Sequence, residues 1–229
     1  MQIPDIIIAI DGFSATGKST LARKIAEAFS FLYLDSGALY RGVTLFAQEN
    51  GYISRDGQIR SEALRAALDR GLDLHFSADG TCIGERGIEK EIRSMEVSGQ
   101  VSPISAEPYV RKFVDAKLRE FAARGRVVMD GRDIGTAVFP DAGLKIFVTA
   151  SHEVRARRRH DELAAKGENP DMEAVMANLA ERDYIDSHRE THPLRRAEDA
   201  FVLDNSDMTL EEEIAWVRGL VQGRFGILG

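Results

Sequence analysis

The chain has 229 residues and a formal net charge of −7, and 44% of its residues are hydrophobic while 29% are charged. This composition is typical of a folded globular protein and excludes an intrinsically disordered or fibrous chain. The acidic balance argues against general binding to nucleic acids or to anionic membranes, which requires a broad basic surface.

Apolar runs without polar alternation predict strands that are covered on both faces, as in a parallel sheet. Helical patterns separate these runs, and one of them places Leu21, Ile25 and Phe29 on a single apolar face. Alternating strands and helices predict an α/β fold built on a five-stranded parallel sheet. The predicted strands are Ile6 to Ile10, Phe31 to Leu34, Val127 to Met129, Lys145 to Val148 and Phe201 to Leu203.

Residues 51 to about 105 interrupt this alternation. Within them Leu72, Leu74 and Phe76 alternate with polar residues before a turn at Asp79–Gly80, which predicts an antiparallel hairpin. We expect this segment to be an inserted subdomain on a single domain that spans 1–229.

A second interruption covers about 153–187. The loop AAKGENPD separates two predicted polar helices, Ser151 to Lys166 and Asp171 to about Ser187, which have little apolar stripe. A helix pair of this kind is a candidate for a mobile lid.

The segment GFSATGKST matches the pattern G-x-x-x-x-G-K-[ST] and lies between a predicted strand and a predicted helix. Its glycines allow the main chain to approach phosphate groups, so that N–H groups and the positive helix end face them. Lys18 supplies a positive charge to the β- and γ-phosphates, and the Ser19 hydroxyl is placed to bind Mg²⁺. The pattern predicts a nucleotide-binding loop made of Gly12, Phe13, Ser14, Ala15, Thr16, Gly17, Lys18, Ser19 and Thr20.

Other polar residues follow the second and third predicted strands. In LDSGALYRG, Ser36 is a good N-cap for a helix that carries Arg41, and the stretch has a purely structural interpretation as a capped helix. In VVMDGRDIG, Arg132 and Asp133 lie at the carboxyl end of a strand, where open α/β sheets bind ligands. Ligand binding and an incidental charged turn both remain open for this second stretch.

A charged stripe extends the apolar face of the second lid helix. Arg182, Asp186 and Arg189 follow at helical spacing, so that they are expected on one side. An exposed Arg–Asp pair contributes only a few tenths of a kcal/mol to stability. Taken alone, the trio is best interpreted as such a surface ion pair without a ligand.

Taken together, these motifs resemble the bacterial cytidylate kinases, a family of nucleoside monophosphate kinases. The resemblance runs through IAIDGFSATGKST, LDSGALYR, EIRSMEVS, PYVR, DGRDIGTAVFPDA, KIFVTAS, RARRR, ERDYIDSHR and FVLDNS, and it covers nearly the whole chain in order. DGRDIGTAVFPDA combined with LDSGALYR is its most specific part. Phe13 and Ser36 depart from the commonest family pattern, which often has proline and threonine there, but neither change removes a needed donor.

The resemblance implies transfer of the γ-phosphoryl group of ATP to CMP or dCMP, with Mg²⁺ as cofactor. It also implies that Asp133 reads the base, and a carboxylate suits cytosine because it accepts a hydrogen bond from the exocyclic amine, whereas uracil presents an oxygen there. The implied acceptor-binding set is Ser36, Arg41, Ser102, Arg111, Arg132, Asp133, Arg182, Asp186 and Arg189, in which Arg41, Arg132 and Arg182 bind the phosphate, Asp186 meets the sugar, Ser102 and Arg111 help to read the base, and Arg189 supports the pocket.

The arginine cluster RARRR places Arg155, Arg158 and Arg159 on one helical face, with Arg157 pointing elsewhere. Like charges at this spacing repel by a few tenths of a kcal/mol, so either solvent or an anion must compensate them. Beside a phosphate loop, we expect the anion to be the triphosphate chain during transfer, and we place Arg132 and Lys18 with these lid arginines as catalytic residues.

No general base is required, because the attacking phosphate oxygen is already ionised at neutral pH. Asp11 and Asp130 both end apolar strands, and the sequence does not choose between them as the holder of the Mg²⁺ hydration shell. The dispersed histidines are interpreted as surface or packing residues: His75, His152, His160, His188 and His192.

Three alternatives share some of these features. Another kinase of the same fold, acting on UMP, AMP or a shikimate-type acceptor, shares the phosphate loop and the lid but not the base reader. A nucleotide-dependent switch hydrolyses its nucleotide slowly, and the chain lacks the N-K-x-D guanine reader. An RNA-binding patch at RARRR would show affinity that falls steeply with salt.

The chain has no signal-peptide pattern and no apolar stretch of membrane-spanning length, so a cytoplasmic location and no membrane partner are expected. The single cysteine, Cys82, cannot form an internal disulfide, which agrees with a reducing compartment. Small nucleotides are the expected partners, nucleic acid is not, and a monomer is compatible with the acidic surface.

Overall fold

The computed structural model describes residues 3–77, 80–123, 125–165 and 167–226. The chain divides into two compact units. Unit 1 takes in the described residues of 1–34, 122–188 and 192–229, and unit 2 consists of 35–121 with 189–191.

Unit 1 is built on a five-stranded sheet with the strand order β2-β6-β1-β7-β8. The pairs β1–β6, β1–β7 and β7–β8 are parallel, and Asp11 of β1 lies opposite Gly131 of β6. The predicted α/β fold with a five-stranded parallel sheet is therefore confirmed. The strands are β1 (Ile7–Gly12), β2 (Leu32–Asp35), β6 (Val127–Gly131), β7 (Leu144–Thr149) and β8 (Phe201–Asp204).

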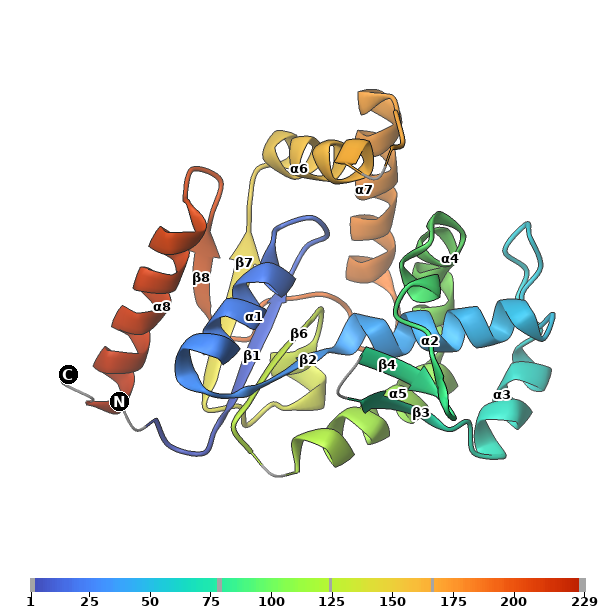
Figure 1. Ribbon diagram of the computed structural model, residues 1–229, viewed down its shortest axis with the longest axis horizontal. Coiled ribbons are helices and arrows are strands. Elements are labelled where there is room, and N and C mark those ends of the chain that lie inside the picture. The colour runs from blue at the N-terminus through green and yellow to red at the C-terminus, as the bar shows by residue number, and fades with distance from the viewer. Residues whose placement is uncertain (1–2, 78–79, 124, 166, 227–229) are drawn as a thin grey trace. The chain divides into compact units, whose positions relative to one another are not determined.

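Helices α1 (Lys18–Phe29) and α8 (Leu210–Phe225) share one hydrophobic core with this sheet. Figure 1 shows both helices beside the strands. The predicted apolar face of α1 is buried there, with Leu21 and Ile25 fully covered. Helix α8 begins with a capping box, in which Thr209 and Glu212 exchange side-chain and main-chain hydrogen bonds. The core therefore holds the sheet end that carries the phosphate loop in a fixed position.

The two predicted lid helices are α6 (His152–Ala165) and α7 (Met172–His188). The sequence predicted little apolar surface for them, but they form a small core of their own from Ala156, Leu163, Val175 and Leu179. The two positions are seven residues apart on α6 and four residues apart on α7, so a narrow apolar stripe on each helix is sufficient to pair them. Lys166, the predicted end of the first lid helix, lies outside the described residues.

A short π-type helical segment, η2 (Ile134–Val138), follows β6 directly. The sequence pattern did not predict it. Its first turn is closed by the main-chain oxygen of Asp133, which accepts from Ala137 N at 2.9 Å and from Val138 N at 3.3 Å.

Unit 2 combines helices with a three-stranded antiparallel sheet in the order β3-β4-β5. The pairing of β3 with β4 confirms the predicted hairpin, although Asp79 of its predicted turn lies outside the described residues. The third strand and several helices here were not predicted. The elements are α2 (Ser36–Glu49), α3 (Ser61–Asp69), β3 (Leu74–Ser77), β4 (Gly80–Ile83), β5 (Arg86–Gly87), η1 (Glu91–Arg93), α4 (Met95–Ala106) and α5 (Pro108–Ala122).

The predicted N-cap of α2 is wrong by one residue. Asp35 caps the helix, because its side chain accepts a hydrogen bond from Ala38 N at 3.1 Å, and Ser36 is the first helical residue. A carboxylate and a hydroxyl cap helices equally well, so local sequence did not distinguish the two.

Candidate functional site

The phosphate loop connects β1 to α1 in a conformation that needs both of its glycines. At Gly12 a Cβ would lie 2.1 Å from the main-chain oxygen of Val148, and Gly17 caps α1 with a φ of 83°. Gly17 contributes no side-chain oxygen to the first turn of α1, so the N–H groups of that turn are left to the main chain and to any anion placed there. This geometry is that of an anion-binding helix end.

Lys18 begins α1 and is only 7% exposed. Its Nζ donates to the main-chain oxygen of Phe13 at 3.2 Å, which places the ammonium group over the loop. A carbonyl oxygen is a neutral acceptor, so this contact orients the ammonium group without cancelling its positive charge.

Arg155 of α6 contacts the same loop. Its guanidinium donates to the main-chain oxygen of Ser14 at 3.3 Å, pairs with Asp183 of α7 at 2.5 Å, and lies 5.2 Å from the centroid of the Phe13 ring. Asp183 also accepts from Ser14 N at 3.4 Å. The buried arginine is thus part of a built contact between the lid helices and the phosphate loop, not a solvated surface charge.

Arg158 of α6 contacts the loop two residues further along the chain. It donates to the main-chain oxygen of Thr16 at 3.2 Å and to the side-chain oxygen of Asn205 at 3.0 Å. Asn205 is fully buried, and its amide donates to Thr16 O at 2.9 Å and to Glu213 at 3.0 Å. Burial raises the pKa of the Glu213 carboxyl, and the charge of Arg158 acts in the opposite direction.

The remaining arginines of the cluster are more exposed. Arg159 pairs with Glu162 on the same helix at 2.8 Å, and Arg157 is exposed. The expectation that Arg157 points away from the other three is confirmed. Arg159, which was grouped with the catalytic arginines, pairs within its own helix, whereas Arg155 and Arg158 donate to the phosphate loop.

Two strand-end carboxylates near the loop have different partners. Asp130 of β6 accepts from the Ser19 hydroxyl at 2.6 Å and from the Tyr33 hydroxyl at 2.8 Å. Asp11 of β1 instead accepts from the amides of Ile134 and Gly135 at 2.8 and 2.7 Å. Hard cations such as Mg²⁺ require oxygen donors, which the Ser19 hydroxyl and the Asp130 carboxylate provide side by side.

The described residues contain no cluster of three or more histidine, cysteine or acidic side chains that would hold a metal by themselves. A Mg²⁺ ion that binds at Ser19 would therefore take most of its ligands from phosphate oxygens and water, as it commonly does.

Burial raises the pKa of Asp11 to about 7, and the neighbouring charge of Asp133 acts in the same direction. The amide hydrogen bonds of Gly135 and Ile134 and the charge of Lys18 lower this pKa. The effect of burial on the pKa is therefore larger than that of the two amide hydrogen bonds and of Lys18 together.

Four predicted acceptor residues lie in unit 1. Arg132 donates to Asp186 of α7 at 2.9 Å and to the Ser14 hydroxyl at 3.0 Å, so it touches the phosphate loop as well. Asp133 is 3% exposed and lies 3.7 Å from the ring of His192. Arg182 is half-buried on α7.

Five other members of the predicted set lie in unit 2. Arg41 pairs at 2.8 Å with Asp35, which also contacts Arg93 at 3.4 Å. Arg111 is 1% exposed, donates to the main-chain oxygen of Ser105 at 3.1 Å, and lies over the Tyr40 ring. The other three are buried: Ser36, Ser102 and Arg189.

The expected helical stripe of Arg182, Asp186 and Arg189 is only partly present. Helix α7 ends at His188, so Arg189 lies just beyond it and belongs to unit 2. Periodicity alone did not reveal this helix end, because the residues that follow carry no glycine or proline until Pro193.

Sequence reasoning missed the partners that hold the predicted residues. Asp183, Asn205 and Tyr33 touch the phosphate loop or its neighbours only through tertiary contacts. Asp183 and Asn205 lie within the stretches ERDYIDSHR and FVLDNS, but no spacing rule relates either of them to a residue more than 100 positions away.

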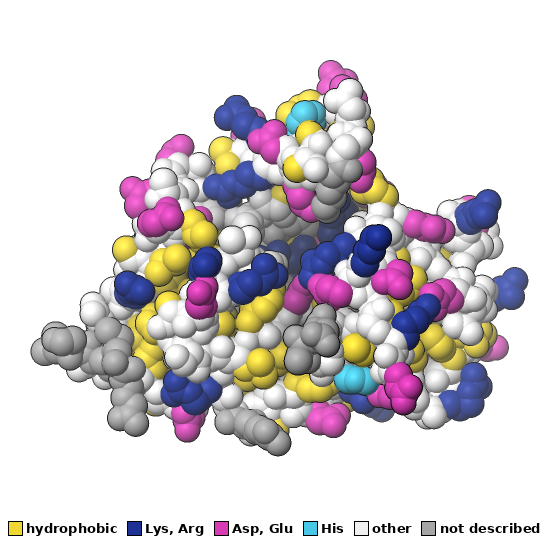
Figure 2. All heavy atoms as spheres, in the orientation of Figure 1, with side chains coloured by type: hydrophobic (Ala, Val, Ile, Leu, Met, Phe, Trp, Pro, Cys, Tyr) yellow, Lys and Arg dark blue, Asp and Glu magenta, His cyan; other side chains and the backbone are white. Residues whose placement is uncertain are grey.

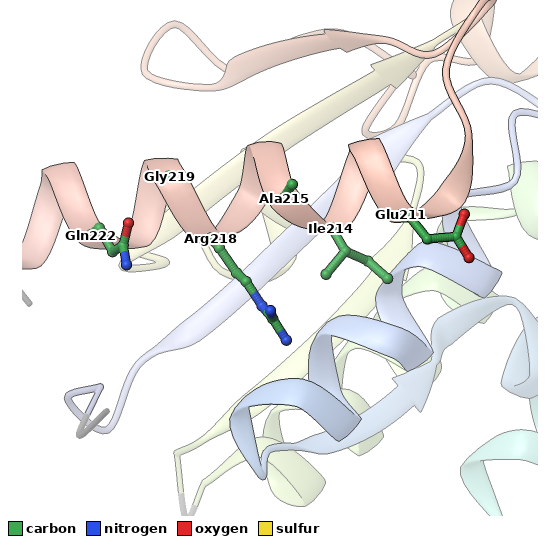
Figure 3. Close-up of a pocket in the computed structure, with 6 residues that line it drawn as sticks. All are labelled: Glu211, Ile214, Ala215, Arg218, Gly219 and Gln222. Carbon is green, nitrogen blue, oxygen red and sulfur yellow. The ribbon is translucent and has the colours of Figure 1, made fainter. Parts of the chain in front are cut away.

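A pocket lies along α8 and contains none of the predicted site residues (Figure 3). It is lined by Glu211, Ile214, Ala215, Arg218, Gly219 and Gln222. On the face shown in Figure 2, basic and acidic side chains are interspersed and form no broad basic surface. Among the described helices, none is both long and apolar enough to span a bilayer.

Comparison with known proteins places these features in a family. The family model described as "Cytidylate kinase" matches residues 8–222. A protein of Parabacteroides distasonis named cytidylate kinase is 50% identical over 218 residues, which cover 93% of this chain and 94% of that protein. One of Bacteroides thetaiotaomicron with the same name is 48% identical over 218 residues, with the same coverage. A crystal structure of a gluconokinase from Sinorhizobium meliloti has a TM-score of 0.50 at 16% identity over 98% of both chains, which shows a shared fold alone.

Proposed function

The chain belongs to the cytidylate kinase family, and we propose that it transfers the γ-phosphoryl group of ATP to CMP or dCMP. In this reaction an oxygen of the acceptor phosphate forms a bond to the γ-phosphorus. The bond from that phosphorus to the β–γ bridging oxygen breaks, and ADP and CDP or dCDP leave. The enzyme is then an ATP-dependent phosphotransferase whose partners are small nucleotides, and we place it in the cytoplasm.

One observation carries the proposal. Three arginines from two separate segments donate hydrogen bonds to Ser14 or Thr16 of the phosphate loop: Arg132, which follows β6, and Arg155 and Arg158 of α6. Charge on the transferred phosphoryl group spreads over its equatorial oxygens, and cations fixed in advance stabilise it without reorganisation. A loop that only bound a nucleotide would not need three further cations from segments more than 100 residues away in the sequence.

The donor residues have distinct roles in this proposal. Amides of the loop from Gly12 to Thr20 bind the phosphates of ATP, and Lys18 neutralises the β- and γ-phosphates. Ser19 and, through water, Asp130 would hold Mg²⁺, which supplies charge neutralisation and orients the phosphate oxygens when it is bound. Arg155, Arg158 and the more exposed Arg159 bind the phosphoryl group as it moves.

The acceptor residues follow the family pattern. Arg41, Arg132 and Arg182 bind the phosphate of CMP, Asp186 binds the sugar, and Arg189 and Ser36 support this part of the site. Ser102, Arg111 and Asp133 read the base. The segments 51–105 and 153–187 serve as the acceptor-binding subdomain and the lid, and closure of the lid excludes water that would otherwise hydrolyse ATP.

A coupled assay of ADP release tests the function. The protein is supplied with ATP, Mg²⁺ and one acceptor at a time, chosen from CMP, dCMP, UMP, AMP, GMP and shikimate. We expect the highest turnover with CMP, less with UMP, and almost none without an acceptor. Highest turnover with AMP or shikimate would assign the chain to another kinase class, and ADP release independent of acceptor would indicate a nucleotide-dependent switch.

The Asp133→Asn substitution tests the base reader. The amide presents a donor where cytosine also presents one, so we expect the ratio of kcat/KM for CMP to that for UMP to fall by roughly tenfold or more. The KM for ATP should change by less than about twofold, because base contacts do not involve the donor. Equal losses with CMP and UMP would remove Asp133 from base recognition.

A further inference from the structure

A buried carboxylate connects the strand that enters the phosphate loop to the segment that follows the base reader. Asp11, the penultimate residue of β1, is 5% exposed. One of its oxygens accepts from Ile134 N at 2.8 Å and the other accepts from Gly135 N at 2.7 Å. Because successive amides bind different oxygens of one carboxylate, both the position and the rotation of the first turn of η2 are fixed.

The main chain that carries Asp133 is fixed on both sides, by strand pairing before it and by Asp11 after it. Gly131 ends β6 and lies opposite Asp11 in the sheet, so the chain is fixed there by strand pairing. It is fixed again at Ile134 by Asp11. Only Arg132 and Asp133 lie between these two points, and both belong to the acceptor-binding set that the family pattern predicts.

Asp11 also differs from the other strand-end carboxylate. Asp130 contacts the Ser19 hydroxyl, which is the group expected near Mg²⁺, whereas the oxygens of Asp11 are directed at main-chain amides of η2. The packing around these amides is close, since a Cβ on Gly135 would lie 3.1 Å from the Lys145 side chain and 3.4 Å from an Asp11 oxygen. The contacts of Asp11 therefore suit the support of η2 better than the support of a metal.

We propose that Asp11 is a positioning residue for acceptor choice, which holds the Ile134 and Gly135 amides and thereby fixes the Asp133 side chain for recognition of an aminopyrimidine base. This inference rests on the proposed function, because base reading by Asp133 is part of that proposal. Asp11 does not touch the acceptor itself. It acts through the main chain on the direction in which the Asp133 carboxylate points.

The substitution Asp11→Asn removes one of the two hydrogen bonds while it keeps the shape of the side chain. An asparagine offers one oxygen and one NH₂ group, so one of the two amides then faces a donor. The turn gains freedom to rotate, and Asp133 with it. An alternative role in which Asp11 only stabilises the fold would lower activity with every acceptor alike.

The experiment measures kcat/KM for CMP and for UMP at saturating ATP, in wild type and in Asp11→Asn. Effects on the donor site cancel in the CMP-to-UMP ratio, because both acceptors are measured with the same donor. We expect this ratio to fall by about tenfold, as the loss of one buried hydrogen bond would give. In an Asp133→Asn background, Asp11→Asn should change the ratio by less than about twofold, because the group that Asp11 positions is already altered.

Two further variants keep the test decisive. Glu213→Gln removes another buried carboxylate that bonds Asn205, and we expect it to leave the CMP-to-UMP ratio unchanged. Gly135→Ala keeps Asp11 but brings a Cβ to 3.1 Å from the Lys145 side chain, which displaces the same turn of η2, and we expect a smaller fall in the ratio than Asp11→Asn gives. This second variant replaces Asp11→Asn if the asparagine protein does not fold.

The outcomes separate the two proposals. A wild-type protein that does not prefer CMP to UMP would defeat the proposed function. A wild-type preference that persists in Asp11→Asn, or in Gly135→Ala where the first variant does not fold, would defeat the positioning role alone. The positioning role would also be overturned if Asp11→Asn lowered the CMP-to-UMP ratio equally in the wild-type and the Asp133→Asn background, because Asp11 would then act independently of Asp133.

Discussion

The phosphate loop of unit 1 and a cluster in unit 2 hold their cationic side chains in different ways. The second, here called the Asp35 cluster, consists of Asp35, Arg41 and Arg93. Lys18, Arg155 and Arg158 each donate to a main-chain oxygen of the loop or of its neighbour. In unit 2, Arg41 pairs with Asp35, which Arg93 also contacts. A carbonyl orients a cation without cancelling its charge, whereas a carboxylate neutralises it.

The difference predicts different electrostatic fields in the two regions. Around the phosphate loop Asp183 pairs with Arg155 and Asp186 pairs with Arg132. The carbonyl contacts of Lys18 and Arg158 add no negative charge of their own, which suits a triphosphate with several negative charges. The Asp35 cluster is closer to neutral, because Arg41 pairs with Asp35 and Arg93 pairs with Glu89 as well as with Asp35. Substitutions in the first region should therefore cost more activity than those in the second.

The largest effect is expected for Lys18→Ala. It removes a buried cation that no other side chain replaces, so we expect kcat with CMP to fall by about a hundred- to a thousandfold. The far-ultraviolet circular dichroism spectrum should remain that of the wild type, since Lys18 lies at the start of α1 and outside the apolar core. A rate near that of the wild type would refute the catalytic role of Lys18 and remove the contrast between the two regions.

An intermediate effect is expected for Arg41→Ala. It removes a cation whose side chain is 21% exposed and already paired, and we expect the KM for CMP to rise by roughly tenfold while the KM for ATP stays nearly constant. Arg93→Ala is the matched control, because Arg93 contacts the same carboxylate but its side chain is 44% exposed. Steady-state kinetics with each nucleotide varied in turn distinguish the two variants. Equal effects of both substitutions would show that Asp35, and not Arg41, organises this cluster.

The smallest effect concerns the pH dependence of stability. Burial raises the pKa of Glu213 above its ordinary value, so the folded state keeps this proton at pH values where the unfolded chain has lost it. The contribution of Glu213 to the free energy of unfolding therefore falls as the pH rises through that window. We expect Glu213→Gln to reduce the loss of Tm between pH 4.5 and neutral pH, measured by thermal melts in matched buffers. A steeper dependence in the variant would contradict the raised pKa.

Much of unit 1 follows from local sequence. Strand β1 and the apolar face of α1 are visible in the sequence because a strand buried on both faces needs a continuous apolar run, and a helix on a sheet needs a stripe. The phosphate loop is visible for a similar reason, since the conformation at Gly12 and Gly17 requires glycine and the ligand requires Lys18 and Ser19.

Unit 2 was predicted less completely. The hairpin was found because Leu72, Leu74 and Phe76 alternate with polar residues, but the third strand, Arg86–Gly87, has only two exposed residues and therefore no pattern. The N-cap of α2 was placed at Ser36 and not at Asp35, because both residue types cap helices and only the hydrogen bond to Ala38 decides between them.

By itself, the sequence determined the class of fold and the phosphate loop, and by resemblance it supplied the proposed set of acceptor-binding residues. Each of these depends on a local pattern, in which neighbouring residues carry the signal. The tertiary structure decided which groups orient those residues: Asp11 at the amides of η2, Asn205 at Thr16 and Asp183 at Arg155. These contacts join residues separated by between 28 and 189 positions, and the free energy of a hydrogen bond depends on the distance between two atoms in space, of which a linear sequence carries no measure.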